Sequence, residues 1–368
     1  MSKKMWYSLM PVLAITTLVL SACGPAPTEA PSATEPAATE APMTEAPAAT
    51  EAPATEAPAA TEAPATGGQV EVFSWWTGGG EAAGLEAMMG VFGEQYPDVE
   101  FVNAAVAGGA GTNARAVLAT RLQSGDPPDS WQGHAGQELI GTYVAGGQIE
   151  PLNDLYEQEG WLDVMPETLI PLISQEGNIY SVPVNIHRAN VLWYNPAILE
   201  EVGAEVPATW DELFEVCNTL IAADRTCIAL GEQWTQMHLL ETILLGTLGA
   251  EAYNGLWDGT TDWGSAEVTT ALETFNRAFD YVNSDYASLT WQDASQLVVN
   301  GDAAFNVMGD WAEGYFRELG MTPNTDYSWS PTPGSDGVFQ FLSDSFLLGV
   351  GAPDPEAATA WLKVAGSK

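Results

Sequence analysis

The sequence is poor in positive charge. Its 368 residues include only 10 lysines and arginines against 49 aspartates and glutamates, a formal net charge of −39. A surface of that sign repels nucleic acid and anionic lipid headgroups, which argues against both as partners. Histidine and cysteine are scarce, with three of each and no CxxC or HExxH spacing, so no metal site and no cofactor are expected.

Motifs typical of several enzyme classes are also absent. The chain has no GxSxG nucleophile elbow and no phosphate-cradling GxxxxGK, since "TGGGE" lacks the lysine. Aromatic residues, in contrast, make up 10% of the chain and include 14 tryptophans. That content is too high for a disordered acidic protein, and the length suffices for two lobes with their own cores.

The first 23 residues have the organisation of an export signal. Lys3 and Lys4 precede the apolar run "MWYSLMPVLAITTLVL", and "LSAC" ends at Cys23. This pattern resembles a bacterial lipoprotein signal, so we expect a signal peptide over 1–22 and lipidation of the Cys23 thiol. An ordinary cleaved signal or a membrane helix is the alternative, although the apolar run is short for a membrane span.

Residues 23–68 are predicted to be the lipidated cysteine followed by a disordered tether. The stretch 25–66 is nearly pure Ala, Pro, Thr and Glu, with seven glutamates and no lysine or arginine. Without Val, Ile, Leu or aromatic residues it cannot bury a core, and its prolines favour an extended chain.

From Gln69 onward strands and helices alternate. "QVEVFSW" alternates in polarity, 81–96 has apolar residues at helical spacing, "DVEFVNAAV" is strand-like, and 113–124 is again helical. This rhythm favours a mostly parallel α/β sheet, whose ligands bind beyond the carboxyl ends of the strands. The segments "SWWTGGGE" and "WQGHAGQE" occupy such positions.

The middle of the chain has a different pattern. Residues 178–199 form a long extended stretch, Thr209 is a candidate N-cap of an amphipathic helix, and a strand returns at 304–308. The chain is therefore expected to cross between two lobes more than once. Cys217 and Cys227 flank a helix-to-strand turn, either as a disulfide or as two buried thiols.

The chain from Gln69 resembles extracellular solute-binding proteins of ABC importers, and most closely those of the glucose/mannose type. The matching segments are "VFSWWTGGGEAAGLEA", "NAAVAGGAGTNARAVLATRL", "GDPPDSWQGHAGQELIGTYV", "SVPVNIHRANVLWYNPAIL", "LTWQDA" and "AAFNVMGDWAEGYF". Such chains normally continue beyond "AATAWLKVAGSK", so we expect this sequence to be truncated at its C-terminus.

The resemblance implies a fold of two lobes, each a mostly parallel sheet flanked by helices, with the ligand in the cleft at the hinge. We expect the N-lobe over 69–183, the C-lobe over 184–306, a return to the N-lobe over 307–342 and a return to the C-lobe over 343–368.

The stretch "SWWTGGGE" has the chemistry of a sugar site. Trp75 and Trp76 can cover the apolar faces of a pyranose, and the glycines let the backbone approach closely. Glu81, in the first helical turn, can accept two hydroxyl protons. The alternative is that one tryptophan packs in the core of the lobe.

Three further candidates come from two other segments. The two-residue spacing of Gln132 and His134 puts both side chains on one face of an extended chain. The resemblance makes both ligand contacts, together with His187 beside the predicted hinge. His238, inside the helical run "QMHLLETILL", is interpreted as structural.

The last candidates follow residue 290. Trp291 precedes a helix and can stack on the opposite sugar face, and Asp344 is flanked by apolar residues, a costly setting unless its carboxylate is paired. Asp310 and Trp311 are secondary candidates, because an aspartate there can simply cap a helix.

These expectations define a non-enzymatic sugar-binding subunit that is extracytoplasmic, anchored through Cys23 to the outer face of the cytoplasmic membrane or periplasmic, and monomeric. It would deliver a glucose-, mannose- or galactose-like monosaccharide to the permease by hinge closure. The alternatives are a secreted glycoside hydrolase, which also needs aromatic platforms and carboxylates, and an adhesive or structural lipoprotein.

Overall fold

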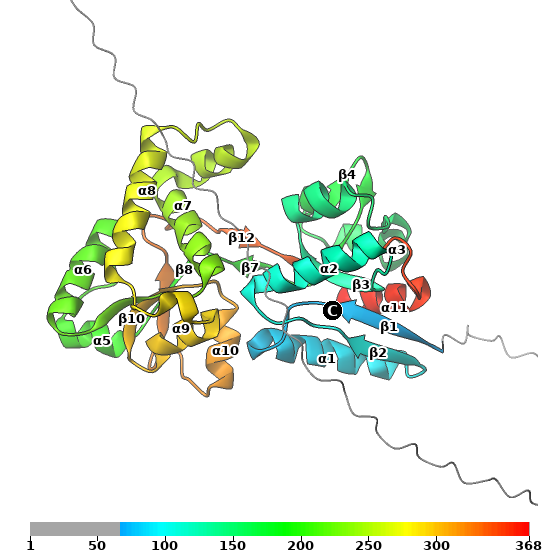
Figure 1. Ribbon diagram of the computed structural model, residues 1–368, viewed down its shortest axis with the longest axis horizontal. Coiled ribbons are helices and arrows are strands. Elements are labelled where there is room, and N and C mark those ends of the chain that lie inside the picture. The colour runs from blue at the N-terminus through cyan, green and yellow to red at the C-terminus, as the bar shows by residue number, and fades with distance from the viewer. Residues whose placement is uncertain (1–66, 368) are drawn as a thin grey trace, which may run out of the picture. The chain divides into compact units, whose positions relative to one another are not determined.

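A computed structural model of the protein describes residues 67–367 (Figure 1). The predicted signal peptide, Cys23 and nearly all of the predicted tether lie outside the described residues. Within the described range, no helix is both long enough and apolar enough to cross a membrane.

The first lobe is built around a five-stranded sheet in the order β2-β1-β3-β13-β6. Its strands are β1 (Gly68–Phe73), β2 (Val99–Asn103), β3 (Ser130–His134), β6 (Val182–Pro183) and β13 (Asp344–Leu348). β1 is parallel to β2 and β3, whereas β13 is antiparallel to both of its neighbours. The sheet is therefore mixed, and the expectation of a mostly parallel sheet holds only for its first three strands.

The second lobe contains a four-stranded sheet in the order β11-β8-β10-β9. Its strands are β8 (Val191–Tyr194), β9 (Thr226–Ala229), β10 (Ala303–Val307) and β11 (Ser328–Pro331). Only β9 and β10 are parallel, because β8 runs antiparallel to both β10 and β11. This sheet too is mixed.

Helices surround both sheets. Those of the first lobe are α1 (Gly79–Gln95), α2 (Thr112–Ser124), α3 (Asn153–Glu159), α4 (Ile170–Ile173) and α11 (Pro355–Ala365), beside the hairpin β4 (Ser174–Gln175) and β5 (Asn178–Ile179). Those of the second lobe are α5 (Pro196–Val202), α6 (Trp210–Ala222), α7 (Gln233–Asp258), α8 (Ala266–Ala278), α9 (Trp291–Val299) and α10 (Ala312–Glu318). Separate clusters of buried apolar residues fill the lobes, as expected of a two-lobe α/β fold.

The helices form where the sequence pattern predicts them. On α1, Leu85 and Phe92 are buried and Met88 lies partly against the same core, which matches the helical spacing. The hydroxyl of Thr209 accepts a hydrogen bond from the backbone N–H of Glu212, whose carboxylate accepts from the Thr209 N–H, so a capping box begins α6.

Two short strands connect the lobes. β7 (His187–Arg188) and β12 (Phe341–Leu342) pair antiparallel, and Figure 1 places them between the lobes. The chain enters the second lobe through β7 and leaves it through β12. A pair of antiparallel connections between two lobes is typical of a hinge.

Both predicted return segments are assigned to the wrong lobe. Residues 307–342 include α10 and β11, and β11 pairs with β8 in the second sheet. Residues 343–368 include β13 and α11, which belong to the first sheet and the first core. The partners of β11 and β13, which are β8 and β3, lie far away in the chain. The sequence of each segment therefore does not indicate the sheet to which it belongs.

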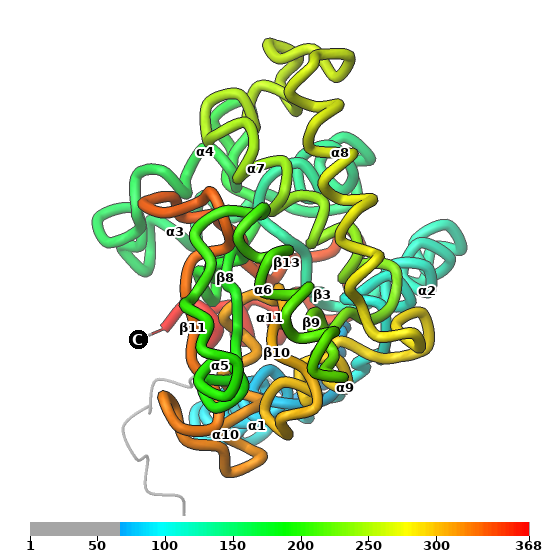
Figure 2. Tube along the Cα trace, turned by 90° about the vertical axis from the view of Figure 1, so that its left-hand side faces the viewer, coloured from blue at the N-terminus to red at the C-terminus, as the bar shows by residue number. Residues whose placement is uncertain are grey.

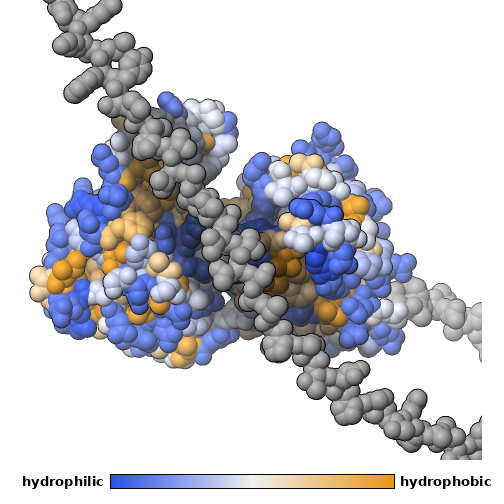
Figure 3. All heavy atoms as spheres, viewed as in Figure 1, coloured by the Kyte–Doolittle hydropathy of each residue, from blue (hydrophilic) through white to orange (hydrophobic). Residues whose placement is uncertain are grey.

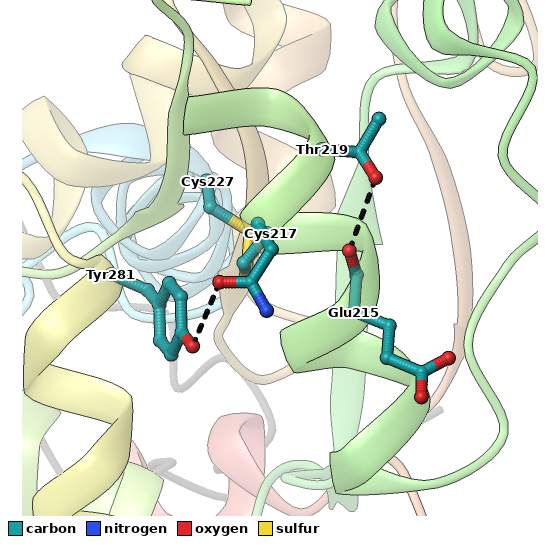
Figure 4. The surroundings of a disulfide bond; sticks show 6 residues. Glu215, Cys217, Thr219, Cys227 and Tyr281 are labelled. Carbon is teal, nitrogen blue, oxygen red and sulfur yellow. Dashed lines mark hydrogen bonds between the residues drawn. A yellow bond between two sulfur atoms is a disulfide. The ribbon is translucent and has the colours of Figure 1, made fainter. Parts of the chain in front are cut away.

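A disulfide joins Cys217 on α6 to Cys227 on β9 (Figure 4). The two Cα atoms are 5.1 Å apart and both residues are buried. In the same region, the Tyr281 hydroxyl donates to the Asn218 side chain at 3.1 Å. Of the two alternatives left by the sequence, the structure has the disulfide, which ties a helix to the strand that follows it.

Candidate functional site

Three strands of the first sheet, β1, β3 and β13, each have one end at the same edge of the sheet. This edge forms half of a pocket. β1 and β3 are parallel, so the residues after Phe73 and the end of β3 at His134 lie at the same edge. β13 runs the other way, and its first residue, Asp344, pairs directly with His134. Side chains from distant parts of the chain, among them Trp75, thus meet at one place.

The Asp344 carboxylate is the centre of this edge. It is only 3% exposed and accepts hydrogen bonds from the side-chain amides of Gln132, at 2.7 Å, and Asn185, at 2.9 Å. The backbone N–H of Asp344 donates to the Asn185 side chain at 2.8 Å. A buried carboxylate is stabilised by such donors, which also fix its orientation.

Two histidines flank Asp344. Nε2 of His134 lies 3.5 Å from its carboxylate and Nε2 of His187 lies 3.8 Å away. The Nδ1 atoms face other carboxylates: Glu138 at 2.9 Å from His134 and Asp310 at 2.5 Å from His187. Burial lowers the pKa of both histidines, but the hydrogen bonds and the surrounding negative charges outweigh burial, so both pKa values are raised.

Glu81 lies in the first turn of α1 and lines the same pocket. Within residues 67–367, no hydrogen bond or ion pair holds its carboxylate. Burial, followed by repulsion from Asp344, raises its pKa to about 8, although His187 and His134 act in the opposite direction. Glu81 is therefore protonated at neutral pH and can both donate and accept a hydrogen bond.

Trp75 and Trp76 point in different directions. Trp75 lines the pocket and lies against His134, with ring centroids 5.1 Å apart. The Arg115 guanidinium lies 5.3 Å from the Trp75 ring, and a β-carbon on Gly111 would lie 2.7 Å from that ring. The glycine therefore permits close contact between a loop and the tryptophan.

The predictions for Trp76 and Gln132 as ligand contacts are corrected by the structure. Trp76 is 5% exposed and packs edge-on against Phe346 in the core, away from the pocket that Trp75 lines. Gln132 is 1% exposed and lies behind the pocket. Its side-chain oxygen accepts a hydrogen bond from the backbone N–H of Trp75 at 3.1 Å, and its amide nitrogen donates to Asp344. It positions two pocket residues and has no surface for a ligand.

The second lobe provides an aromatic wall. Trp234, Trp291 and Trp311 line the pocket, and the rings of Trp234 and Trp311 lie 6.4 Å apart. The predicted Trp291 and the secondary candidate Trp311 are thus brought to the site. Trp234 donates from its indole to the Glu232 carboxylate at 3.1 Å, which fixes the orientation of its ring.

His238 and Asp310 are secondary members of the site. His238 borders the pocket, but its Nε2 bonds the Ala189 carbonyl at 2.8 Å. Burial lowers its pKa to about 4, so it is neutral and structural, as the sequence predicts. Asp310 accepts from the Arg188 backbone N–H at 3.0 Å and holds His187, which it therefore positions.

Together these side chains line an open cavity of about 400 Å³ between the lobes, in the hollow visible in Figure 3. His187 and Leu342 of the hinge strands line it as well. A pocket lined by carboxylates, histidines and tryptophans has the chemistry to hold a neutral, hydroxyl-rich molecule with an apolar face. No cluster of His, Cys, Asp or Glu that could hold a metal ion occurs in the described part of the chain.

The sequence prediction missed the contribution of α7. Trp234, Met237 and Glu241 all line the pocket. Their spacing of three, four and seven residues places them on one face of a helix, a pattern that could have been recognised in "QWTQMHLLE". Arg115 was missed too, and nothing in its local sequence distinguishes it from a surface arginine.

Residues 67–368 match the family described as bacterial extracellular solute-binding proteins, and the chain belongs to this family. An uncharacterized ABC transporter extracellular-binding protein of Pyrococcus horikoshii is 34% identical over 81% of this chain and 68% of its own length. A probable sugar-binding periplasmic protein of Mesorhizobium japonicum is 31% identical, over 81% of this chain and 71% of its own. The xylose/arabinose-binding protein XacG of Haloferax volcanii is 30% identical, over 82% of this chain and 66% of its own.

Solved structures support the same fold. The bacterial solute receptor AcbH, described with an exclusive preference for β-D-galactopyranose, has a TM-score of 0.69 and 19% sequence identity, covering 82% of this chain and 76% of its own. At this identity the likeness concerns the fold alone. It agrees with the two lobes and the hinge described above.

Proposed function

We propose that this protein is the sugar-binding component of an ABC importer and that its ligand is a monosaccharide of the glucose, mannose or galactose type. The observation that carries the proposal is the division of the pocket into a hydrogen-bonding side and an aromatic side. Relatives named as sugar-binding proteins, at 30–31% identity, support the same class of ligand.

The polar side suits the rim of a sugar. Asp344 can accept hydroxyl protons, while the protonated Glu81 can donate to one ring hydroxyl and accept from another. His134 and His187 can donate through the Nε2 atoms that already face Asp344. Trp75 on one side and Trp291 and Trp311 on the other can cover the apolar faces of the ring.

The size of the pocket favours a small sugar. A cavity of about 400 Å³ lies near the lower end of the ~300–1,000 Å³ range of small-molecule pockets. The name of the Haloferax relative refers to two monosaccharides, which agrees with a ligand of one ring. A hexose such as glucose differs from a pentose such as xylose, in the six-membered ring form, by one additional hydroxymethyl group.

The proposal places the protein outside the cytoplasm as a monomer that delivers its ligand to a membrane permease. Lipidation of Cys23 would anchor it, and hinge closure about β7 and β12 would enclose the sugar. Small-angle scattering with and without saturating sugar tests the closure, because closure lowers the radius of gyration. An unchanged radius would contradict it.

Calorimetric titration against a panel of hexoses, pentoses and disaccharides tests the choice of ligand. We expect saturable binding of one hexose and weaker binding of its deoxy analogues, because a buried donor or acceptor is then left unpaired. Binding of disaccharides alone would contradict the monosaccharide assignment. A reducing-sugar assay on oligosaccharides, run in parallel, should show no hydrolysis.

A further inference from the structure

The lobes touch each other at a pair of glycines as well as at the hinge. Gly80 lies in the first turn of α1, and Gly314 lies within α10 of the second lobe. A β-carbon on Gly80 would lie 2.8 Å from the Cα atom of Gly314, and one on Gly314 would lie 3.0 Å from the Cα atom of Gly80. Both views in Figures 1 and 2 show α1 and α10 side by side.

Only glycine permits this approach. The neighbouring atoms are backbone, which cannot turn aside as a long side chain can. The contact also extends beyond the pair, because a β-carbon on Gly79 would lie 3.5 Å from that of Tyr315. Two helices from different lobes thus meet backbone to backbone.

The contact adjoins the pocket on both sides. Gly80 directly precedes Glu81 in the chain, and Gly314 follows Trp311 by one helical turn; Glu81 and Trp311 both line the cavity. The separation of α1 from α10 therefore sets the separation between a hydrogen-bonding residue of one lobe and an aromatic residue of the other.

We propose that the Gly80–Gly314 contact is a spacer that sets the width of the pocket and restricts it to a ligand of one sugar ring. This inference rests on the proposed function, since it assigns a size limit to the same sugar site. The hinge strands let the lobes rotate, and the glycine pair determines how near α1 and α10 come to each other.

The decisive variant is Gly80→Ala in the full chain. Alanine favours the helix more than glycine does, so α1 itself is not weakened. The added methyl group overlaps Gly314 and should hold the lobes apart, lowering affinity for the monosaccharide by about tenfold, as expected for overpacking by one methyl group. Affinity for the corresponding disaccharide should fall less or rise.

The matched control is Gly84→Ala on the same helix, where a β-carbon would meet nothing within 4 Å. This variant should bind both sugars as the wild type does. Gly314→Ala should reproduce the effect of Gly80→Ala from the other side. The double variant should lose less than the sum of the two single losses, because both act on one contact.

Equal monosaccharide affinity in Gly80→Ala, Gly314→Ala and Gly84→Ala would overturn the spacer. So would a loss at Gly80 or Gly314 that is the same for both sugars, together with a lower melting temperature. If the wild type binds neither sugar, the proposed function fails, and crystal structures of the ligand-free variants still test the spacer. A wider separation of Glu81 from Trp311 in Gly80→Ala than in Gly84→Ala supports it, and an equal separation refutes it.

Discussion

The two halves of the pocket are built in different ways. In the first lobe, the pocket residue Asp344 is buried and held by two side-chain amides, and His134 is held between two carboxylates. In the second lobe, the largest side chains of the wall are Trp234, Trp291 and Trp311, which lie beside Met237 and Glu241. The first half is preorganised to recognise hydroxyl positions, and the second provides area for stacking.

Breaking the polar half should have the largest effect. In Asp344→Asn, the new amide group would face the amide donors of Gln132 and Asn185, and the negative charge between the histidines would be lost. We expect sugar affinity to fall by about 3 kcal/mol, more than a hundredfold, along with a lower melting temperature. Calorimetry checks this against Asp336→Asn, an exposed position at which binding should be unchanged.

The two consecutive tryptophans of the first lobe, Trp75 and Trp76, should contribute to different properties. Trp75→Ala should weaken sugar binding by about 2 kcal/mol, roughly thirtyfold, because a stacking surface is lost. Trp76→Ala should instead lower the free energy of unfolding by about 3–5 kcal/mol and leave the affinity of the folded protein near that of the wild type. Denaturation and titration of both variants test this; a large affinity loss in folded Trp76→Ala would contradict the assignment.

The aromatic half should be less sensitive to single substitutions. Trp311→Ala removes one of the three tryptophan rings with which the second lobe lines the pocket, so we expect a loss of about tenfold in affinity with little change in stability. Trp329→Ala is a suitable control, because that ring is 47% exposed and lies outside the pocket lining. A loss equal to that of Asp344→Asn would show that stacking dominates recognition.

A further effect, on stability and not on affinity, is expected from pH. Because the pKa of Glu81 is raised to about 8 in the folded protein, the folded state holds a proton there that the unfolded state loses from about pH 4.5 upward. Loss of this proton from the unfolded state makes the free energy of unfolding fall as the pH rises from about 4.5 to about 8. Glu81→Gln removes this dependence, so its melting temperature should fall less over this range than that of the wild type. Parallel melting curves from pH 5 to 8 provide the measurement.

Much of the site could be predicted because its residues follow strands at one edge of a sheet. Glu81 and His134 lie in segments predicted to follow strands, with the resemblance supporting His134, whereas Asp344 was predicted from its apolar flanks; all three line the pocket. The sequence does not show which of two consecutive tryptophans faces the core, because Trp76 is oriented by Phe346, which is far away in the chain. The interpretation of Gln132 failed for a similar reason: a buried amide and a ligand contact have the same local pattern.

The fold was predictable in its local parts and less so in its connections. Alternation and helical spacing located β1, α1, α2 and the N-cap of α6, since these depend on neighbouring residues. The lobe assignment of 307–342 and 343–368 depends on pairing between strands separated by the whole second lobe. The sequence of neither segment indicates which strand it pairs with.

The position of β13 has a consequence for how the protein is made. This strand lies between β3 and β6 in the first sheet, yet it follows every residue of the second lobe in the chain. A ribosome therefore makes β8 to β11, the strands of the second sheet, before the first lobe receives its missing strand. Until Asp344 and its neighbours have been synthesised, the strands β3 and β6 of the first lobe each keep an unpaired edge. Asp344, at the centre of the pocket, is thus added only after β8 to β11 have been made, and the site forms only once β13 has joined the first sheet.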